Sequence, residues 1–350
     1  MCSLIKAIHL SLAISFAISI SLPNIVHGLE AKAVIDSPLL TEKIGTNRTI
    51  KVDINGNGEF KSIQAAIDSV HEENSQWIVI HVRKGIYREK VHIPENKPYI
   101  FLRGNGKGRT YIVWSQSSSD NVGSATFKVE SPNFIAFGVS FKNEAPTGVA
   151  YTSQNQSVAA FVAADGVAFY HCAFYSTHNT LFDYKGRHYY DNCYIQGSVD
   201  FIFGRARSIF HSCEIFVVSD KRLSISGSIT AHNRESSADE GGFVFVKGKV
   251  YGTDDVYLGR AKGPYSRTVF AKTYLSKTIV PHGWTNWSCE GSTENLFQAE
   301  YKTHGPGSKS DKRASWSKQL TKEEVAPFVS IDFIDGKQWL PVWLEDALDS

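Results

Sequence analysis

The stretch Ile195-Gln-Gly-Ser-Val-Asp-Phe-Ile-Phe-Gly204 sets one carboxylate, Asp200, inside a run of residues that favour β-strands. In a strand alternate side chains share a face, so Asp200 lies on the same face as Ser198. A carboxylate in such apolar surroundings is costly to desolvate unless a partner pairs with it. The stretch therefore predicts either a structural aspartate bound to Arg205 or Arg207, or a nucleophile or base at the mouth of a cleft.

A short motif, an aromatic residue followed three positions later by a cysteine, recurs on both sides of this stretch. It ends at Cys172, Cys193 and Cys213, so that the cysteines are 21 and 20 residues apart. Strand-sized units at this period predict the coils of a parallel β-helix, in which each coil buries its inward residues on the next. Neighbouring coils lie about 4.8 Å apart, so the cysteines form either an inward ladder or a disulfide-bonded pair. We favour the ladder.

The rest of the chain predicts an all-β fold with short capping helices. Short strand-like segments separated by turns follow Trp77 as far as Leu275. Helices are expected at residues 61–70 and after Thr321, which begins a capping box. We expect these helices to cover the ends of the solenoid. The polar residues 219–241 interrupt the coils, and we interpret them as an excursion from the stack.

Composition and the first residues favour a secreted globular protein. The chain has 350 residues, 42% apolar and 21% charged, and its net charge of +2 argues against a nucleic-acid or membrane-surface protein. Residues 1–28 have one charge, Lys6, before an apolar run and small residues, which predicts a signal peptide. A polar lead-in (29–48) and one domain (49–350) follow. Secretion makes three asparagines candidate glycosylation sites: Asn47, Asn155 and Asn286.

Three polar residues follow one another at equal spacing through the repeats. Gln156, His178 and Asp200 are separated by 22 and 22 residues, so coils of that length would stack them in one column. An amide, an imidazole and a carboxylate together predict an acyl-transfer site, which needs a nucleophile, an oxyanion donor and a proton donor. The alternative is a solvated polar ladder.

The column lacks a cation for Asp200, and Arg260 is the candidate. It follows a strand and a glycine, and three plain coils would place it about 14 Å along the stack. Contact therefore requires residues 219–241 to add little height. Arg205 is the competing partner.

Several segments together resemble plant pectin methylesterases (pectinesterases) from Val52 to the C-terminus. They are residues 195–204, 85–89, 156–159, 229–231, 258–260 and 301–307. The resemblance is to members without an N-terminal inhibitory pro-region. It implies a single-stranded right-handed parallel β-helix, secretion to the cell wall, no metal or cofactor, and hydrolysis of the methyl esters of polygalacturonate.

The resemblance also implies roles for individual residues. Asp200 would attack the ester carbonyl, Gln156 would donate to the oxyanion, and Arg260 would hold Asp200 ionised and oriented. Thr126 and Trp284 would bind substrate, although Trp284 has the alternative of a core position near the end of the solenoid. The implied partners of a monomeric enzyme are pectin and a proteinaceous pectinesterase inhibitor.

The chain departs from the family pattern at two places. Where the family has a second amide followed by the acid/base aspartate, this chain has His178 and Asn179. Asparagine cannot release a proton, and general acid–base catalysis is typically worth about 10²–10⁴-fold. We hypothesise that His178 supplies the proton, as an imidazole can near neutral pH. Ala261 and Lys262 replace a Pro-Trp pair, which removes a stacking ring.

Two functions therefore follow from the sequence. The first is a secreted pectinesterase of reduced or pH-shifted activity. The alternative is a catalytically impaired pectin-binding cell-wall protein. A lyase would need an acidic calcium cluster and a polygalacturonase would need paired acids, and neither is evident.

Overall fold

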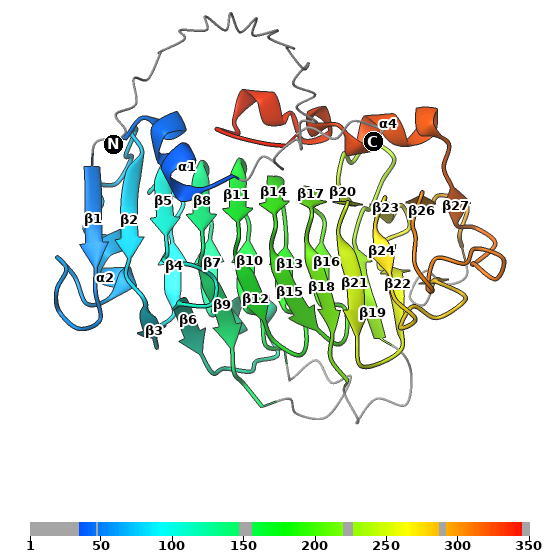
Figure 1. Ribbon diagram of the computed structural model, residues 1–350, viewed down its shortest axis with the longest axis horizontal. Helices are drawn as coiled ribbons and strands as arrows, with labels where there is room; N and C mark the ends of the chain where they lie inside the picture. The colour runs from blue at the N-terminus through cyan, green and yellow to red at the C-terminus, as the bar shows by residue number, and fades with distance from the viewer. Residues whose placement is uncertain (1–34, 47, 147–155, 220–226, 287–291, 345–350) are drawn as a thin grey trace, which may run out of the picture. The chain divides into compact units, whose positions relative to one another are not determined.

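The computed structural model describes residues 35–46, 48–146, 156–219, 227–286 and 292–344. They lie within one compact unit, Ile35–Ser350. In it the chain winds into a solenoid whose successive coils add strands to three parallel sheets (Figure 1). The predicted parallel β-helix is therefore confirmed.

The three sheets are named A, B and C in the order in which most coils visit them. Sheet A contains β1 (Arg48–Val52), β2 (Ile78–Val82), β5 (Ile100–Arg103), β8 (Phe134–Phe137), β11 (Val167–Tyr170), β14 (Arg187–Asp191), β17 (Arg207–His211), β20 (Gly242–Val246), β23 (Arg267–Ala271), β26 (Phe297–Tyr301) and β27 (Lys318–Gln319). Sheet B contains β3 (Gly85–Tyr87), β6 (Thr110–Trp114), β9 (Ser140–Asn143), β12 (Ala173–Tyr175), β15 (Tyr194–Gly197), β18 (Glu214–Val217), β21 (Lys249–Gly252) and β24 (Tyr274–Leu275). Sheet C contains β4 (Val91–Ile93), β7 (Phe127–Val129), β10 (Ala160–Val162), β13 (Leu181–Asp183), β16 (Ile202–Gly204), β19 (Gly227–His232), β22 (Val256–Ala261) and β25 (Trp284–Thr285).

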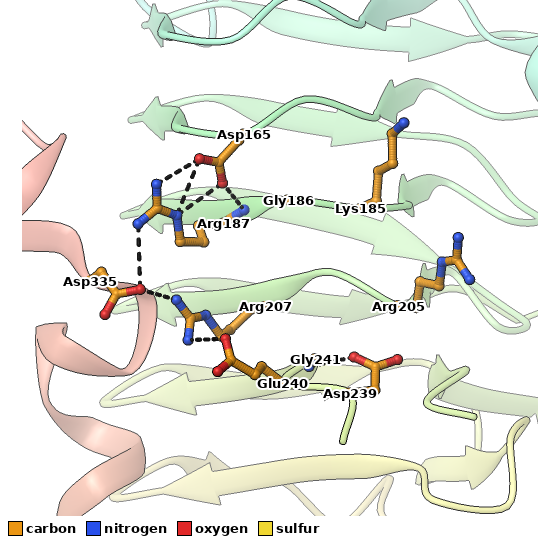
Figure 2. A pocket seen from close by; sticks show the side chains of 10 residues that line it. All are labelled: Asp165, Lys185, Gly186, Arg187, Arg205, Arg207, Asp239, Glu240, Gly241 and Asp335. Atoms are coloured by element: carbon orange, nitrogen blue, oxygen red, sulfur yellow. Dashed lines mark hydrogen bonds and ion pairs between the residues drawn. The ribbon is translucent and has the colours of Figure 1, made fainter. Parts of the chain in front are cut away.

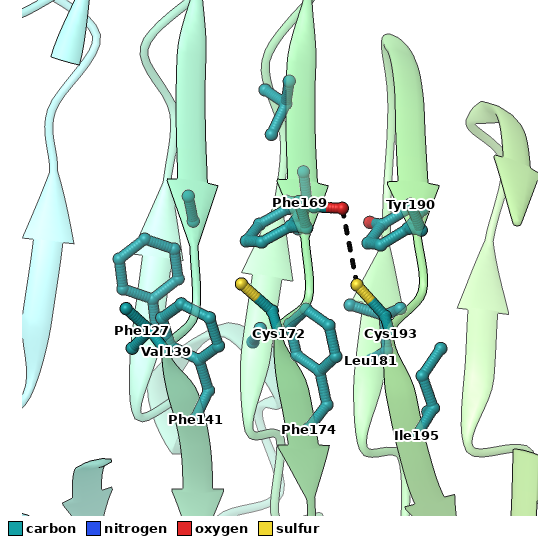
Figure 3. Packing of buried hydrophobic residues seen from close by; sticks show 14 of the residues in the cluster. Phe127, Val139, Phe141, Phe169, Cys172, Phe174, Leu181, Tyr190, Cys193 and Ile195 are labelled. Atoms are coloured by element: carbon teal, nitrogen blue, oxygen red, sulfur yellow. Dashed lines mark hydrogen bonds between the residues drawn. The ribbon is translucent and has the colours of Figure 1, made fainter. Parts of the chain in front are cut away.

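The cysteine motif marks the corner between sheets A and B. The residue before each cysteine, His171, Asn192 or Ser212, has a left-handed φ of 51°, which turns the chain and points the cysteine inward. All three cysteines are buried and free, so the ladder is confirmed and the disulfide-bonded pair among them is excluded. Figure 3 shows two of them, Cys172 and Cys193, among the buried residues of neighbouring coils. The fourth cysteine of the chain after residue 28, Cys289, lies outside the described residues.

The aromatic residues of the motif begin a continuous stack inside the solenoid, which Phe245 and Phe270 extend over the next two coils. Phe169, Tyr190, Phe210, Phe245 and Phe270 contribute one ring per coil, with centroids 4.4 to 5.2 Å apart and planes within 11° of parallel. This spacing is close to that of neighbouring strands. Because each ring pair is worth about 0.5–1.5 kcal/mol beyond its burial, the stack favours one register of coil on coil.

The helices do not all cover the ends of the solenoid. Helix α2 (Ile63–Asp68) does pack into the first coil, where its apolar residues join the interior cluster. Helices α1 (Ser37–Ile44) and α4 (Lys322–Val329), with the 3-10 turns η1 (Ile331–Ile334) and η2 (Gly336–Gln338), instead join the apolar cluster on the outer face of sheet A. The predicted capping box is present, since the side chains of Thr321 and Glu324 each bond the other residue's backbone. The remaining helix is α3 (Asn121–Ser124).

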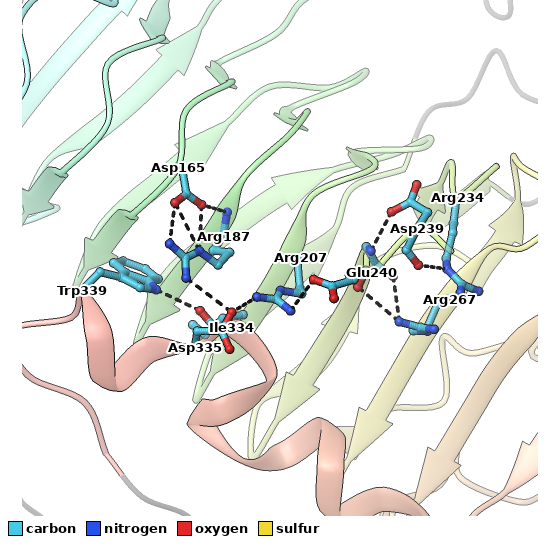
Figure 4. Close-up of polar contacts among 11 residues, drawn as sticks. Asp165, Arg187, Arg207, Arg234, Asp239, Glu240, Arg267, Ile334, Asp335 and Trp339 are labelled. Carbon is cyan, nitrogen blue, oxygen red and sulfur yellow. Dashed lines mark hydrogen bonds and ion pairs between the residues drawn. The ribbon is translucent and has the colours of Figure 1, made fainter. Parts of the chain in front are cut away.

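The C-terminal tail is tied to sheet A by ion pairs. Asp335 bonds Arg187 and Arg207 on adjacent strands, and Arg207 also pairs with Glu240 at 2.8 Å (Figure 4). Arg207 is therefore paired with these two acids.

In the described part of the chain no helix is long and apolar enough to cross a membrane.

One prediction about the stack is wrong. Residues 219–241 are not mainly an excursion, because they contain strand β19, which lies between β16 and β22 in sheet C. The segment therefore supplies the sheet C strand of one coil.

Candidate active site

Asp200 lies in the turn between β15 and β16, and glycines make this turn possible. Its φ is 46°, a left-handed conformation in which aspartate and asparagine are enriched among non-glycine residues. A side chain at Gly197 would overlap Phe201, and one at Gly204 would overlap the carbonyl of Asp183. The two glycines that flank the carboxylate in the sequence are thus needed to bring Asp200 to the surface of sheet C.

The Asp200 carboxylate is held by Arg260 and Ser228. Arg260 Nε donates to Oδ1 at 2.9 Å and to Oδ2 at 2.8 Å, and a terminal guanidinium nitrogen lies 2.7 Å from Oδ2. Ser228 Oγ donates to Oδ1 at 2.5 Å, while its carbonyl accepts from the Asp200 N–H at 2.7 Å. Such charge-assisted bonds are short and strong, and they fix the position of the carboxylate.

The predicted Asp200–Arg260 contact is present, although the route differs from the prediction. The strand register aligns Phe203 with Ala231 and Ala231 with Arg260, so Arg260 starts two strands beyond the coil of Asp200. Two strand spacings are about 10 Å, shorter than the distance expected for three coils. The small Ala231 lies between, which leaves room for the arginine to reach back. The competing Arg205 instead stacks its guanidinium 5.2 Å from the ring of Tyr184.

The predicted column is displaced by one residue. His178 forms a parallel bridge with Val199, and Leu181 pairs with Ile202, so the coil here is one residue shorter than the column requires. Asn179, not His178, is therefore the register partner of Asp200. Asn179 has the same left-handed turn, with φ 57°, and its amide donates to Asn121 Oδ1 at 2.9 Å. His178 is the buried residue immediately before it.

Gln156 lies in the segment before β10, where it pairs with Ser118. Its backbone exchanges two hydrogen bonds with Ser118, of 2.9 and 3.0 Å. Its side-chain Oε1 is buried and has no hydrogen-bond partner in the described part of the chain. Buried polar atoms in native proteins nearly always have a hydrogen-bond partner. The Gln156 side-chain oxygen is an exception, since no hydrogen bond to the fold holds it.

The other two predicted substrate-binding residues do not face a groove. The Thr126 side chain is fully buried and donates to the carbonyl of Lys142 at 3.2 Å. Trp284 is fully buried in the interior cluster, and its ring packs against Phe270 with centroids 6.0 Å apart. A ring with no exposed surface cannot contact a sugar, so Trp284 occupies the alternative core position.

Sequence reasoning missed Ser228 and an aromatic row on the outer face of sheet C. Phe161, Phe182 and Phe203 are register partners on consecutive strands, with centroids 5.1 and 4.3 Å apart. Their equal spacing along the chain is visible in the sequence and is the signal for the row. Ser228 lies farther from Asp200 along the chain than this spacing and so breaks the period, which is why no spacing rule found it.

Comparison with known proteins identifies the family of this fold and site. The pectinesterase family model matches residues 49–337. The chain belongs to the pectinesterase family. It is 70% identical over 315 residues to probable pectinesterase 67 of Arabidopsis thaliana, covering 90% of this chain and 92% of that protein. Membership makes the chain a carboxylic ester hydrolase.

Solved structures agree with this assignment. Pectin methylesterase from carrot superposes with a TM-score of 0.80 at 29% identity, covering 86% of this chain and 98% of that one. A pectin methylesterase in complex with a hexasaccharide has a TM-score of 0.71 at 22% identity, covering 85% and 100%, and supports the fold alone. The predicted right-handed parallel β-helix is the fold of these pectinesterases.

Proposed function

We propose that the chain is a secreted pectinesterase that hydrolyses the methyl esters of polygalacturonate in the plant cell wall. The observation that carries the proposal is the Asp200 carboxylate held on the outer face of sheet C by Arg260 and Ser228. The family, and relatives whose names specify pectin methyl esters, support the substrate.

The proposed reaction begins with attack by Asp200. A carboxylate oxygen forms a bond to the ester carbonyl carbon, and the carbonyl oxygen becomes an oxyanion that accepts a hydrogen bond from the Gln156 amide. The bond from this carbon to the methoxy oxygen then breaks, and that oxygen takes a proton and leaves as methanol. Water attacks the resulting acyl-enzyme and gives up a proton, so that free galacturonate and the Asp200 carboxylate are restored.

Protonation of the leaving methoxy oxygen is the step that needs a different donor in this chain. Asn179 is the register partner of Asp200, but its amide is far too weak an acid to transfer a proton. His178 is the adjacent titratable side chain on the same turn. We therefore assign to His178 the proton that methanol takes, and the acceptance of the proton that water releases.

The setting of the enzyme completes the proposal. The apolar segment in residues 1–28 supports secretion. Among the candidate glycosylation sites Asn47 and Asn155 lie outside the described residues, whereas Asn286 lies within them and is partly exposed. The monomeric state and the proteinaceous inhibitor stay predictions.

Methanol release from highly methylated pectin tests the proposal. We expect release by the natural protein and a fall of at least about 10³-fold in Asp200→Asn, because loss of a nucleophile removes the covalent route. The matched control is Asp254→Asn, on an exposed turn, which should keep full activity. Melting temperatures establish that each variant is folded.

The same experiment distinguishes the alternative function. Background release by both the natural protein and Asp200→Asn, with pectin binding retained, would establish a catalytically impaired pectin-binding protein instead.

A further inference from the structure

Asn143, at the end of β9, has a buried side chain that joins several segments of the backbone. Its amide nitrogen donates to the carbonyls of Gln116, Ser124 and Val158 at 2.9, 3.0 and 3.1 Å. Its amide oxygen accepts from the N–H groups of Gln116 and Ala145 at 3.2 and 3.0 Å. An asparagine amide offers two N–H groups and two lone pairs, so this side chain is fully used by the backbone around it.

Two of these contacts lie on either side of Gln156. Gln116 precedes Ser118 by two residues, and the backbone of Ser118 exchanges two hydrogen bonds with that of Gln156. Val158 follows Gln156 by two residues. Asn143 therefore holds both the segment that pairs with Gln156 and the segment that follows it.

A third contact leads to the turn at position 179. Ser124 Oγ accepts from the N–H of Val158 at 3.1 Å and donates to the carbonyl of Asn121 at 2.9 Å. Asn121 Oδ1 in turn accepts from the Asn179 amide at 2.9 Å. Through Ser124, the same buried amide thus contacts helix α3, which reaches the turn.

The Gln156 side chain depends on this support because its own oxygen is not held. Its Oε1 is buried and has no hydrogen-bond partner in the described part of the chain. The backbone of Gln156, by contrast, is fixed by the bridge to Ser118. A misplacement of about 1 Å in a catalytic site can lower the rate about 10²-fold, so the backbone contacts decide where the Gln156 amide lies.

We propose that Asn143 is a positioning residue for the reaction, which orders the segment of Gln156 and so places the amide that binds the oxyanion. The inference rests on the proposed function, in which Gln156 donates to the oxyanion. Asn143 itself takes no chemical step, because its amide is occupied by backbone groups.

A double-mutant cycle with Gln156 tests this role. Asn143→Ala should lower kcat for methanol release about 10- to 100-fold and change KM less than about threefold, because the oxyanion forms only in the transition state. In the Gln156→Ala background, Asn143→Ala should lower kcat less than about threefold, since the amide that Asn143 places is already absent. Equal losses in the two backgrounds would overturn the inference.

A second variant guards against loss of the fold. Asn143→Ser keeps one donor and one acceptor, and it replaces Asn143→Ala in the cycle if the alanine variant does not fold. If neither variant folds, Asn143 is a residue of the fold alone and the inference fails.

The matched control, Asp335→Asn, breaks ion pairs on the outer face of sheet A. Asp335 pairs with Arg187 and Arg207 beside a cavity of about 490 Å³ (Figure 2). This variant should lower the melting temperature and leave kcat and KM unchanged. A loss of kcat as large as that in Asn143→Ala would mean that any loosening of the solenoid lowers activity, and the positioning role would fail.

Hydrogen exchange separates this inference from the proposed function. The N–H of Gln156 should exchange at least about 10-fold faster in Asn143→Ala than in the natural protein, and Asp335→Asn should leave its rate unchanged. If exchange rises in this way but the natural protein releases no methanol, Asn143 still orders the segment and the proposed reaction fails. If methanol is released but exchange and kcat are unchanged in Asn143→Ala, the positioning role alone fails.

Discussion

Two turns of the solenoid, residues 177–180 and 198–201, have nearly the same backbone and opposite chemistry. Each carries a left-handed residue, Asn179 at φ 57° and Asp200 at φ 46°, and the two are register partners. The difference lies in what the neighbouring coils supply. For Asp200, the position three residues on and two strands along is Arg260, whereas the equivalent position for Asn179 is Ala231. The two turns therefore have equivalent positions in successive coils, and of the two only the turn at Asp200 has an arginine at the position that contacts it.

This difference explains which turn suits a nucleophile and which suits an acid. The Arg260 guanidinium orients both oxygens of the Asp200 carboxylate, so the turn at Asp200 fits a nucleophile. A carboxyl group at position 179 would lack that cation and would lie about one strand spacing from the negative charge of Asp200. Both conditions favour its protonated form. Position 179 therefore suits a proton-donating carboxyl group, but in this chain the residue there is an asparagine.

Asn179→Asp tests this comparison most strongly. We expect kcat for methyl ester hydrolysis to rise about 10- to 100-fold near pH 6–7, because the new carboxyl group supplies general acid catalysis. Asn121 Oδ1, which now accepts from the Asn179 amide at 2.9 Å, would accept from the protonated acid instead. The measurement is the pH dependence of methanol release.

The control for this gain is the same change in the Asp200→Asn background, where no increase is expected. An unchanged or lower kcat in the single variant would show that the turn at position 179 does not act as a proton donor in this chain.

The fold could be predicted from the sequence because its signals are local. The motif ending at Cys172, Cys193 and Cys213 repeats without insertions, and the structure confirms coils at that period. The exact alignment could not be predicted, because residues counted along the chain include turns of unknown length. On sheet C the register pairs Leu181 with Ile202, Ile202 with Thr230 and Thr230 with Gly259, so the later coils are longer than the first. The coil before Asp200 has 21 residues, the spacing of Cys172 and Cys193, and the predicted column used 22, which chose His178 in place of Asn179.

The candidate site was predictable where sequence motifs carried it and not where burial decided. Asp200 and Arg260 were found from their motifs, and their contact is present. The exposure of Trp284 depends on how the last coils close over it, and the ring is fully buried. Ser228 reaches Asp200 from a strand that was expected to leave the stack.

His178→Gln tests the proposed replacement of the missing acid. We expect kcat to fall about 10-fold near neutral pH, and its pH dependence in that range to flatten. This loss is smaller than the roughly 10²–10⁴-fold typical of general acid–base catalysis, because His178 is aligned with Val199 and not with Asp200. The pH–rate profile of methanol release is the measurement. An unchanged rate and profile would remove His178 from the mechanism.

The double variant His178→Gln/Asn179→Asp is the matched control. It restores the pair of residues that the family pattern has at these positions. The glutamine should therefore lower kcat little when an aspartate follows it. A large loss in the double variant would mean that His178 acts in packing the turn and not as a proton donor.

Ser228→Ala should have the smallest effect on the turn at Asp200. The hydroxyl donates to Oδ1 at 2.5 Å, but Arg260 contacts both carboxylate oxygens and would keep Asp200 in place. We expect kcat to fall about 3- to 10-fold, since a single hydrogen bond to a charged group is worth about 1.5–3 kcal/mol and part of it is made up by the arginine. Ser208→Ala is the matched control, because its hydroxyl donates to the buried Asp183 and does not contact Asp200. This control should lower the melting temperature and leave kcat unchanged. If Ser228→Ala behaved in the same way, Ser228 would belong to the packing of the coil, and Arg260 alone would distinguish the Asp200 turn from the Asn179 turn.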